Sequence, residues 1–221
     1  MGLKRTFSDL SPGDFGKKVA FVWLGHQWPD GFVPVGEPMS WVQDSLQLAR
    51  QLHPIFEQVG VAYYITGGVA ATAYGDPRTS RDLDVVINVG QEDLGPLIAV
   101  LEEAGFYVPG VEDMVSGRLR TLQIIHQETV MQADLMVSGA ERWDALKFER
   151  RRLEGGVYFI SPEDVVLNKL KWRLSSQSEK QWRDVLGVLK VQGERLDLAY
   201  MKQWADALGL EEDFMRACQE A

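Results

Sequence analysis

The sequence predicts an α+β or α/β fold, with a short mixed β-sheet flanked by helices and a C-terminal helical subdomain. Three observations lead to this prediction. An apolar run ends on Gly67-Gly68 and leads through small residues to an Asp-x-Asp segment at 82–84. Residues 120–137 alternate between apolar and polar side chains, as the two strands of a hairpin do. After Ser161, apolar residues recur at helical spacing almost to the end of the chain.

We expect three segments: an N-terminal arm of unassigned role at 1–38, a core at 39–160 and the helical subdomain at 161–221. The arm is rich in Gly and Pro, which favour turns and extended chain over helix, although residues 19–24 are apolar enough for a strand. Two interpretations of the arm stay open. It packs on the body of the protein, or it acts as a lid or binds a partner.

In the core, residues 39–59 have the apolar spacing of a helix, with Ser40 as its N-cap and a kink or break at Pro54. The elements that follow are expected in this order: strand 61–65, short helix 69–74, strand 82–87, helix 91–104, edge strand 106–108, loop 113–117, a hairpin over 120–137, helix 138–152 and strand 155–160. Gly155-Gly156 precedes a strand and not a helix, so it indicates a turn and no phosphate loop.

The helical subdomain begins at a strong start signal. Ser161 is a suitable N-cap, Pro162 fits the first turn, and two acidic residues follow it near the positive end of the helix dipole. This helix is expected to reach about residue 174, with Val166, Leu170 and Leu174 on its buried face. Further helices are expected at 179–190, 197–208 and 211–219.

Composition limits the classes of function. The hydrophobic share of 45% and the charged share of 25% are those of an ordinary globular protein. The net charge of −9 argues against a protein that coats nucleic acid non-specifically. A single cysteine, Cys218, excludes an intrachain disulfide and favours a reducing, cytoplasmic setting. No apolar run approaches the length of a membrane span, so we expect no membrane partner.

The Asp-x-Asp segment is the first candidate for chemistry. Side chains alternate along a strand, so Asp82 and Asp84 point the same way, and a divalent cation is the usual reason for two carboxylates to lie so close. Gly67-Gly68 at a helix start offers backbone N–H groups to a phosphate. Asp134 lies within an apolar strand, where a carboxylate is costly unless it is paired or bound to a metal.

The ordered combination of strand, Gly67-Gly68, helix, Asp82-x-Asp84 and strand resembles the signature of the nucleotidyltransferase superfamily, which has the DNA polymerase β-like fold. The run Arg78-x-Ser80-x-Asp82 is similar to the Arg-x-Thr-x-Asp run of small bacterial and archaeal members, with Ser in place of Thr. The resemblance implies a nucleotidyltransferase-like core.

A second resemblance lies downstream. The segments Pro162-Glu-Asp164, Lys169-Leu170 and Arg183-Asp184 resemble, in the same order, an element of bacterial members that include abortive-infection-type toxins. In those proteins the basic residues of this element face the active site. The resemblance covers about residues 60–190 and leaves both ends of the chain outside.

The resemblance implies a Mg²⁺- or Mn²⁺-dependent enzyme that transfers a nucleoside monophosphate from an NTP to a hydroxyl acceptor. It implies that Asp82, Asp84 and Asp134 are catalytic residues and metal ligands. Nucleotide or phosphate contacts are implied for Thr66, Gly67, Gly68, Arg78, Lys169, Arg173 and Arg183. The acceptor is unassigned: a protein, a tRNA end or a small molecule such as an antibiotic. A toxin–antitoxin or phage-defence setting, with a cognate partner protein, is implied by resemblance alone.

Other interpretations stay open. The fold could serve as a catalytically silent binding module or an antitoxin-like partner protein, although the complete set of carboxylates argues against it. A phosphate-binding protein of another α/β type is disfavoured because the sequence lacks G-x-G-x-x-G. Asp82 and Asp84 could also form a solvated strand end, and Asp134 could pair with Arg118 or Arg120. The basic residues could be ordinary helix surface or ion-pair partners of the aspartates.

Overall fold

The computed structural model describes residues 29, 31–33, 44–76, 82–90 and 92–221. Its centre is a seven-stranded mixed sheet with the strand order β3-β4-β5-β2-β1-β7-β6. The strands are β1 (Ala62–Ile65), β2 (Leu83–Asn88), β3 (Phe106–Tyr107), β4 (Thr121–His126), β5 (Met131–Val137), β6 (Arg152–Glu154) and β7 (Val157–Phe159). The pairs β1–β7 and β2–β5 are parallel and the other four pairs are antiparallel. This confirms the predicted short mixed sheet.

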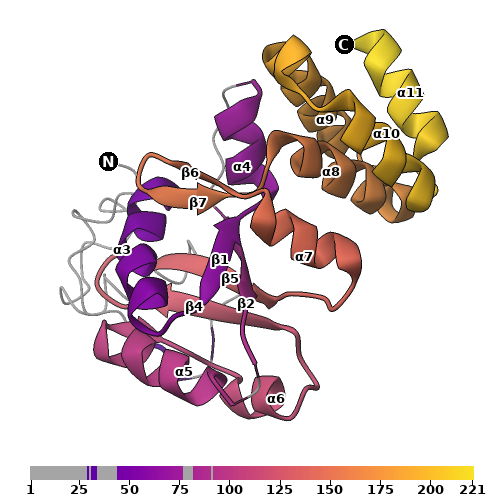
Figure 1. The fold of residues 1–221 in the computed structure, drawn as a ribbon. Helices are drawn as coiled ribbons and strands as arrows, with labels where there is room; N and C mark the ends of the chain where they lie inside the picture. The colour runs from indigo at the N-terminus through magenta and orange to yellow at the C-terminus, as the bar shows by residue number, and fades with distance from the viewer. Residues whose placement is uncertain (1–28, 30, 34–43, 77–81, 91) are drawn as a thin grey trace, which may run out of the picture.

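Helices pack around the sheet, and the last four helices form a group beside it (Figure 1). The helices are α3 (Ser45–Gln58), α4 (Gly67–Tyr74), α5 (Leu94–Glu103), α6 (Val111–Val115), α7 (Arg142–Glu149), α8 (Pro162–Ser176), α9 (Glu179–Gln192), the 3₁₀ turn η3 (Gly193–Arg195), α10 (Leu198–Ala207) and α11 (Glu211–Glu220). Helices α8 to α11 form a group at one end of the molecule, and α7 lies between that group and the strands. Within the described part of the chain, no helix is long and apolar enough to cross a membrane.

Strand β2 shows the alternation that the sequence predicts. Leu83, Val85 and Ile87 are buried, whereas Asp84 and Val86 on the opposite face are only half-buried. The buried face packs under α3, whose own buried residues include Leu48, Leu52 and Phe56. Because one face of the strand is committed to this core, the other face is left to carry the carboxylates.

Five local details differ from the sequence-based expectation. Helix α3 begins at Ser45, because the Asp44 carboxylate accepts the N–H groups of Leu46 and Gln47 and acts as the cap. The expected cap Ser40 and the expected strand at 19–24 lie outside the described residues. Helix α3 also continues through Pro54 without a break.

The expected loop at 113–117 is in part a helix, α6, whose first turn carries Glu112 and Asp113 near the positive end of its dipole. The strand β6 was not expected. It pairs with β7 through the turn at Gly155-Gly156, whose φ angles of +60° and +87° suit glycine. Leu174, expected in the core, is 55% exposed because it lies on the outer face of α8.

A buried carboxylate joins the core to the helical subdomain. Ser161 caps α8 as predicted, accepting the N–H of Asp164 at 3.1 Å. The Asp164 side chain, which is fully buried, accepts hydrogen bonds from Trp143 Nε1 on α7 at 2.9 Å and from Tyr200 Oη on α10 at 2.7 Å. Burial raises the pKa of Asp164, and the donors around it oppose that shift. Three helices therefore meet at one carboxylate.

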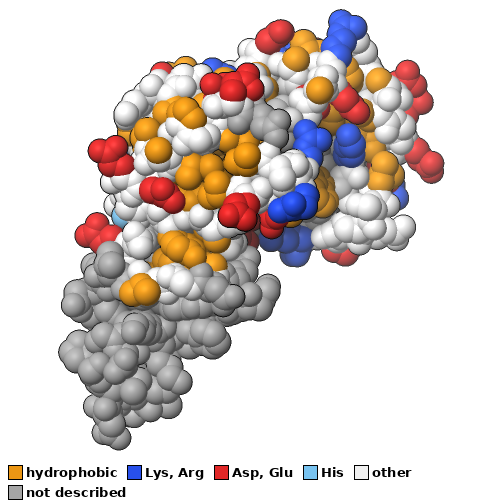
Figure 2. Space-filling model, turned by 90° about the horizontal axis from the view of Figure 1, so that it is seen from below, with side chains coloured by type: hydrophobic (Ala, Val, Ile, Leu, Met, Phe, Trp, Pro, Cys, Tyr) orange, Lys and Arg blue, Asp and Glu red, His pale blue; other side chains and the backbone are white. Residues whose placement is uncertain are grey.

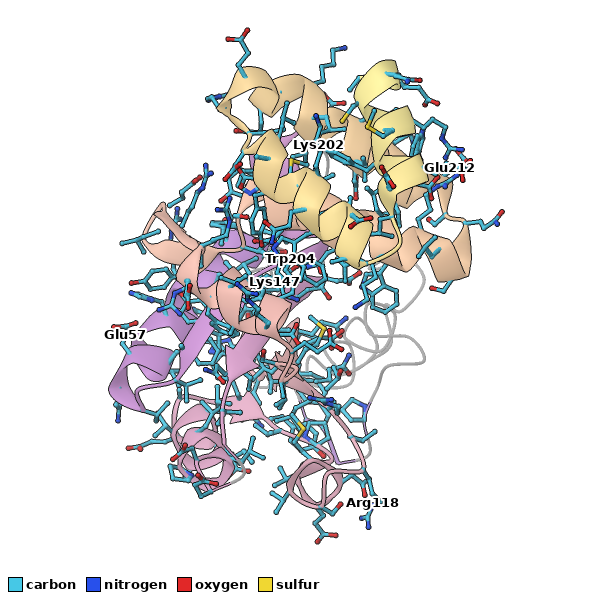
Figure 3. The ribbon with its side chains drawn as sticks, turned by 45° about the vertical axis from the view of Figure 1, so that its right-hand side comes forward. Glu57, Arg118, Lys147, Lys202, Trp204 and Glu212 are labelled. Carbon is cyan, nitrogen blue, oxygen red and sulfur yellow. The ribbon has the colours of Figure 1, made fainter. Side chains whose placement is uncertain are left out.

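Glu163, next to Asp164 in the chain, also connects the core to the helical subdomain; we call this contact region around Asp164 and Glu163 the joint. It is 1% exposed, lies 3.4 Å from Arg150 and 3.5 Å from Arg152, and accepts the backbone N–H of Asp197 at 3.1 Å. Beside it, the rings of Trp143 and Trp204 stack with centroids 6.1 Å apart. Figure 3 labels Trp204 near the boundary between α7 and the helical subdomain.

Helices α4 and α9 touch through glycines. A Cβ on Gly75 would lie 2.9 Å from the backbone N of Val188, and a Cβ on Gly187 would lie 3.2 Å from the backbone N of Asp76. The two backbones can approach this closely only without side chains at these positions. Helix α4, which begins at the Gly-Gly motif, therefore packs with its C-terminal end against α9 of the helical subdomain.

Removing the Tyr200 hydroxyl tests the joint at Asp164. Tyr200→Phe keeps the ring but takes one donor from a buried carboxylate, so we expect a loss of about 2 kcal/mol in the free energy of unfolding. Urea denaturation measures it. The same substitution in an Asp164→Asn background should cost clearly less, because the acceptor charge is gone. Equal costs in both backgrounds would show that the hydrogen bond contributes nothing specific.

Candidate active site

A cavity of about 390 Å³ lies between the open face of the sheet and the helical subdomain. Its walls come from the start of α4, from β1 and β2, from the end of β5 and the loop after it, and from α7, α8 and α9. The predicted residues Thr66, Gly67, Gly68, Asp82 and Asp84 all line it. Tertiary packing thus brings the Gly-Gly and Asp-x-Asp motifs to one space.

The first turn of α4 lies directly against Asp84. Gly67 has a φ of +64°, and a Cβ there would overlap Oδ2 of Asp84. The Asp84 carboxylate accepts the backbone N–H of Gly68, while its carbonyl accepts the N–H of Thr66 at 2.9 Å. Thr66 occupies the N-cap position but makes no capping bond with its own side chain. The helix start therefore presents N–H groups to the cavity without a side-chain cap.

Three carboxylates lie close enough to repel one another. Asp84 and Asp134 are partners in the register of the parallel strands β2 and β5. Burial first, and then the charges of Asp134 and Asp82, raise the pKa of Asp84. Burial also raises the pKa of Asp134, with a further contribution from Asp82, against a 3.4 Å hydrogen bond from Gln123. The arrangement accumulates negative charge that a cation would offset.

The structure places Asp134 beside the site but not among the residues that line the cavity. The alternative partners considered for it are engaged elsewhere: Arg118 pairs with Asp113, and Arg120 donates to the carbonyl of Ser138 at 2.9 Å. Within the described residues, no three His, Cys, Asp or Glu side chains are arranged as a metal centre by themselves. The oxygen donors of the three aspartates nevertheless suit a hard cation such as Mg²⁺.

Lys169 supplies a buried positive charge. It lines the cavity from α8, its Nζ lies 2.8 Å from Asp184 of α9, and the two side chains are 8% and 7% exposed. Its charge also lowers the pKa of Asp84 and so favours the ionised carboxylate. Asp184 holds the ammonium group at the wall of the cavity.

Two other predicted basic residues, Arg173 and Arg183, do not line the cavity. Arg173 lies 3.3 Å from Asp213 of α11 and over the ring of Trp182. Arg183 is exposed on α9, and Arg78 lies outside the described residues. A phosphate contact for these three arginines stays a prediction.

Sequence reasoning missed one wall of the cavity, which α7 supplies. Asp144 and Lys147 line it and form an ion pair of 2.8 Å, and the Lys147 ammonium also lies 4.2 Å from the centroid of the Trp143 ring. Figure 3 labels Lys147 close to Trp204, at the boundary with the helical subdomain. No sequence signal marks this wall, because Lys147 is only 7% exposed in the structure whereas a lysine in a sequence is expected on the surface.

A second missed group lies on α8 and α9. Val165, Asn168 and Trp172 line the cavity together with Lys169, at the spacing that places residues on one helix face. Lys180 and Gln181 add the first turn of α9. Figure 2 shows Lys and Arg side chains gathered near the middle of one face of this acidic protein. Positive charge is therefore concentrated locally.

Comparison with solved structures supports the fold. An antigenic nucleotidyltransferase-like protein from Paracoccidioides brasiliensis matches with a TM-score of 0.50 and 17% identity, over 79% of this chain and 92% of that one. The chain has a nucleotidyltransferase-like fold.

Two further matches have lower TM-scores than that protein. The antibiotic-resistance factor ANT(2″)-Ia, solved with adenylyl-2″-tobramycin, has a TM-score of 0.49 and 14% identity over 74% of this chain and 95% of its own. A putative nucleotidyltransferase from H. pylori has a TM-score of 0.46 and 15% identity over 78% and 80%. No protein-family model and no curated protein sequence matches the chain. The nucleotidyltransferase-like fold therefore rests on structure.

Two glycines with the same backbone conformation provide a test of the helix start. Gly67→Ala strains a positive φ and also displaces Asp84, whereas Gly60→Ala strains a φ of +68° with nothing within 4 Å. Both should lose about 1–2 kcal/mol of stability from strain. The nucleotide contact that the sequence predicts for Gly67 implies that only Gly67→Ala weakens Mg²⁺–ATP binding, by more than about tenfold, in calorimetric titration. Equal binding by the two variants would contradict the nucleotide contact predicted for Gly67.

Burial of Asp84 and its repulsion by Asp134 and Asp82 predict a variant that is more stable. The folded protein keeps the Asp84 proton at pH values where the unfolded chain has released it, so stability falls as pH rises from the usual carboxyl range through the raised pKa. In chelator-containing buffer, Asp84→Asn should unfold a few degrees higher than the wild type above that window and equally below it. Asp113→Asn, at an exposed ion pair, should show no such divergence. A variant that is less stable at every pH would contradict the raised pKa of Asp84.

Proposed function

We propose that this protein is a metal-dependent nucleotidyltransferase that moves a nucleoside monophosphate from an NTP to a hydroxyl acceptor and releases pyrophosphate. The observation that carries the proposal is the contact between Asp84 and the start of α4, in a cavity that also contains Lys169. An anion-binding helix start, a carboxylate cluster and a buried lysine together match the needs of phosphoryl chemistry.

The chain's own groups would hold the triphosphate. Thr66, Gly67, Gly68 and Lys169 all line the cavity, so the backbone N–H groups of this turn, the Thr66 hydroxyl and the Lys169 ammonium are the groups that would contact the phosphates. Because Asp84 already accepts the Gly68 N–H, the phosphates would use the other donors of this turn. Positioning the reacting phosphorus and offsetting its charge accounts for most of the rate enhancement in such reactions.

Asp82, Asp84 and Asp134 would hold Mg²⁺ or Mn²⁺. The fit rests on their oxygen donors and on the burial and mutual repulsion that raise the pKa of Asp84 and of Asp134. When bound, the cation neutralises phosphate charge and acts as a Lewis acid on the transferred group. Asp134, beside the cavity, would also accept the proton of the acceptor hydroxyl.

The identity of the acceptor is a separate part of the proposal. A protein, a tRNA end and a small hydroxylated molecule are the candidates, and the net charge of −9 disfavours RNA. The tobramycin adduct belongs to ANT(2″)-Ia and sets no preference here. A toxin–antitoxin or phage-defence setting with a cognate partner protein stays a prediction.

Incubation with α-³²P-labelled ATP, CTP, GTP or UTP and Mg²⁺ or Mn²⁺ tests the reaction. We expect metal-dependent binding, and label transfer to the protein itself or to a component of cell extract. Replacing Asp82 and Asp84 together with Asn should lower transfer at least about a hundredfold. Asp113→Asn, remote from the cavity, serves as the matched control.

The outcomes separate the enzyme from its alternative. Binding of NTP without release of pyrophosphate from any mixture would favour the catalytically silent binding module. If no NTP binds in the presence of metal, and the double Asn substitution changes nothing, both the enzyme and the binding module are overturned.

A further inference from the structure

Trp172 is an exposed indole on the wall of the cavity. It lies on α8 and is 65% exposed, more than any other large hydrophobic side chain among the described residues. Leaving an indole in water forgoes the stabilisation that its burial would give. On the same helix face, Asn168 and Lys169 lie one turn before it and also line the cavity. The ring is therefore placed where a ligand of the cavity would cover it.

Gln181 gives a second, independent observation. It lines the cavity from the first turn of α9, and its amide oxygen Oε1 is inaccessible to solvent. Among the described residues, no hydrogen-bond donor reaches that oxygen. A buried acceptor without a partner costs free energy, so a rotation of the Gln181 amide that brings this oxygen to the cavity would be favoured when a ligand supplies a donor there. The missing partner must be a donor.

The position of these residues relative to Lys169 indicates which part of a ligand they would meet. Lys169 and the start of α4 mark the phosphate end of the cavity, because both act on Asp84. Trp172 lies almost a full helical turn beyond Lys169. A nucleotide with its phosphates near Lys169 and the start of α4 would have its base near Trp172.

We propose that Trp172, Gln181 and Asn168 form a base-binding subsite that selects adenine, an assignment that rests on the proposed function. The indole would stack on the base, which every nucleobase permits. The side-chain amides would read its edge, since Gln and Asn pair with the adjacent amino donor and ring-nitrogen acceptor of adenine. Cytosine presents a similar edge on a smaller ring and should rank second. Hypoxanthine, guanine and uracil present a carbonyl oxygen there, which repels Oε1.

Binding of ATP and ITP, compared by calorimetry with Mg²⁺ and no acceptor, tests the edge contact. The two nucleotides differ at position 6 of the base. Adenine has there the amino group from which Gln181 would accept a hydrogen bond, and hypoxanthine has a carbonyl oxygen. We expect the wild type to bind ATP about tenfold more tightly than ITP. Gln181→Met, which keeps the volume and removes the acceptor, should bring the Kd for ATP to that for ITP and leave ITP unchanged. Equal affinities for ATP and ITP in the wild type would overturn the selection of adenine.

Substitution of Trp172 tests stacking. Trp172→Ala should raise the Kd for ATP roughly tenfold, while Trp172→Phe should keep most of the affinity. Leu174→Ala is the matched control, because Leu174 is 55% exposed on the same helix and does not line the cavity. Inorganic tripolyphosphate should bind the wild type and Trp172→Ala equally, since it has no base.

The remaining outcomes assign failure to one proposal or the other. If Trp172→Ala leaves the Kd for ATP within about twofold and instead raises the KM for an acceptor, the indole belongs to the acceptor and the base subsite is wrong. If tripolyphosphate binds but no base is preferred, the proposed function survives and this inference does not. If neither tripolyphosphate nor any NTP binds with metal present, both are overturned.

Discussion

At the start of α4, the carboxylate of Asp84 lies against the backbone of Gly67, where any side chain would overlap it. This contact places a negative charge at the positive end of a helix and leaves neighbouring N–H groups facing the same cavity. Burial and two further carboxylates raise the pKa of Asp84, so its ionised form costs free energy in the folded protein. Phosphates entering such a space would add negative charge. Lys169 and a bound cation are the groups that could balance it.

The helical subdomain completes the site from the other side. Its attachment depends on Asp164, a buried carboxylate with donors from two other helices, and on the side-chain-free contact between Gly75 and Gly187. The motif Pro-Glu-Asp at the start of α8 is therefore part of the joint between the two halves of the molecule. The same helix then presents Lys169 and Trp172 to the cavity. Stability of the joint and geometry of the site are linked through one helix.

The sequence predicted correctly those elements that depend only on residues close together in the chain. The alternation of β2, the hairpin of β4 and β5, and the cap at Ser161 all follow from spacing and residue type within a few positions. The expected fold class is confirmed for the same reason. Failures occurred where packing competed: Leu174 fits an apolar stripe but lies on the outer face of α8, and β6 forms because β7 provides an edge for Arg152–Glu154 to pair with.

By itself, the sequence determined the order of the Gly-Gly and Asp-x-Asp motifs and, through the two-residue period of a strand, that Asp82 and Asp84 share a face. Only the tertiary structure decided that Asp84 meets the N–H of Gly68, and that Lys169 reaches the cavity while Arg173 pairs with Asp213. It alone also added the walls formed by α7 and by Trp172 and Gln181. The reason is physical: the cavity is built from segments far apart in the chain. Side-chain direction there is set by which helices pack together, and residue spacing along one segment carries no information about that.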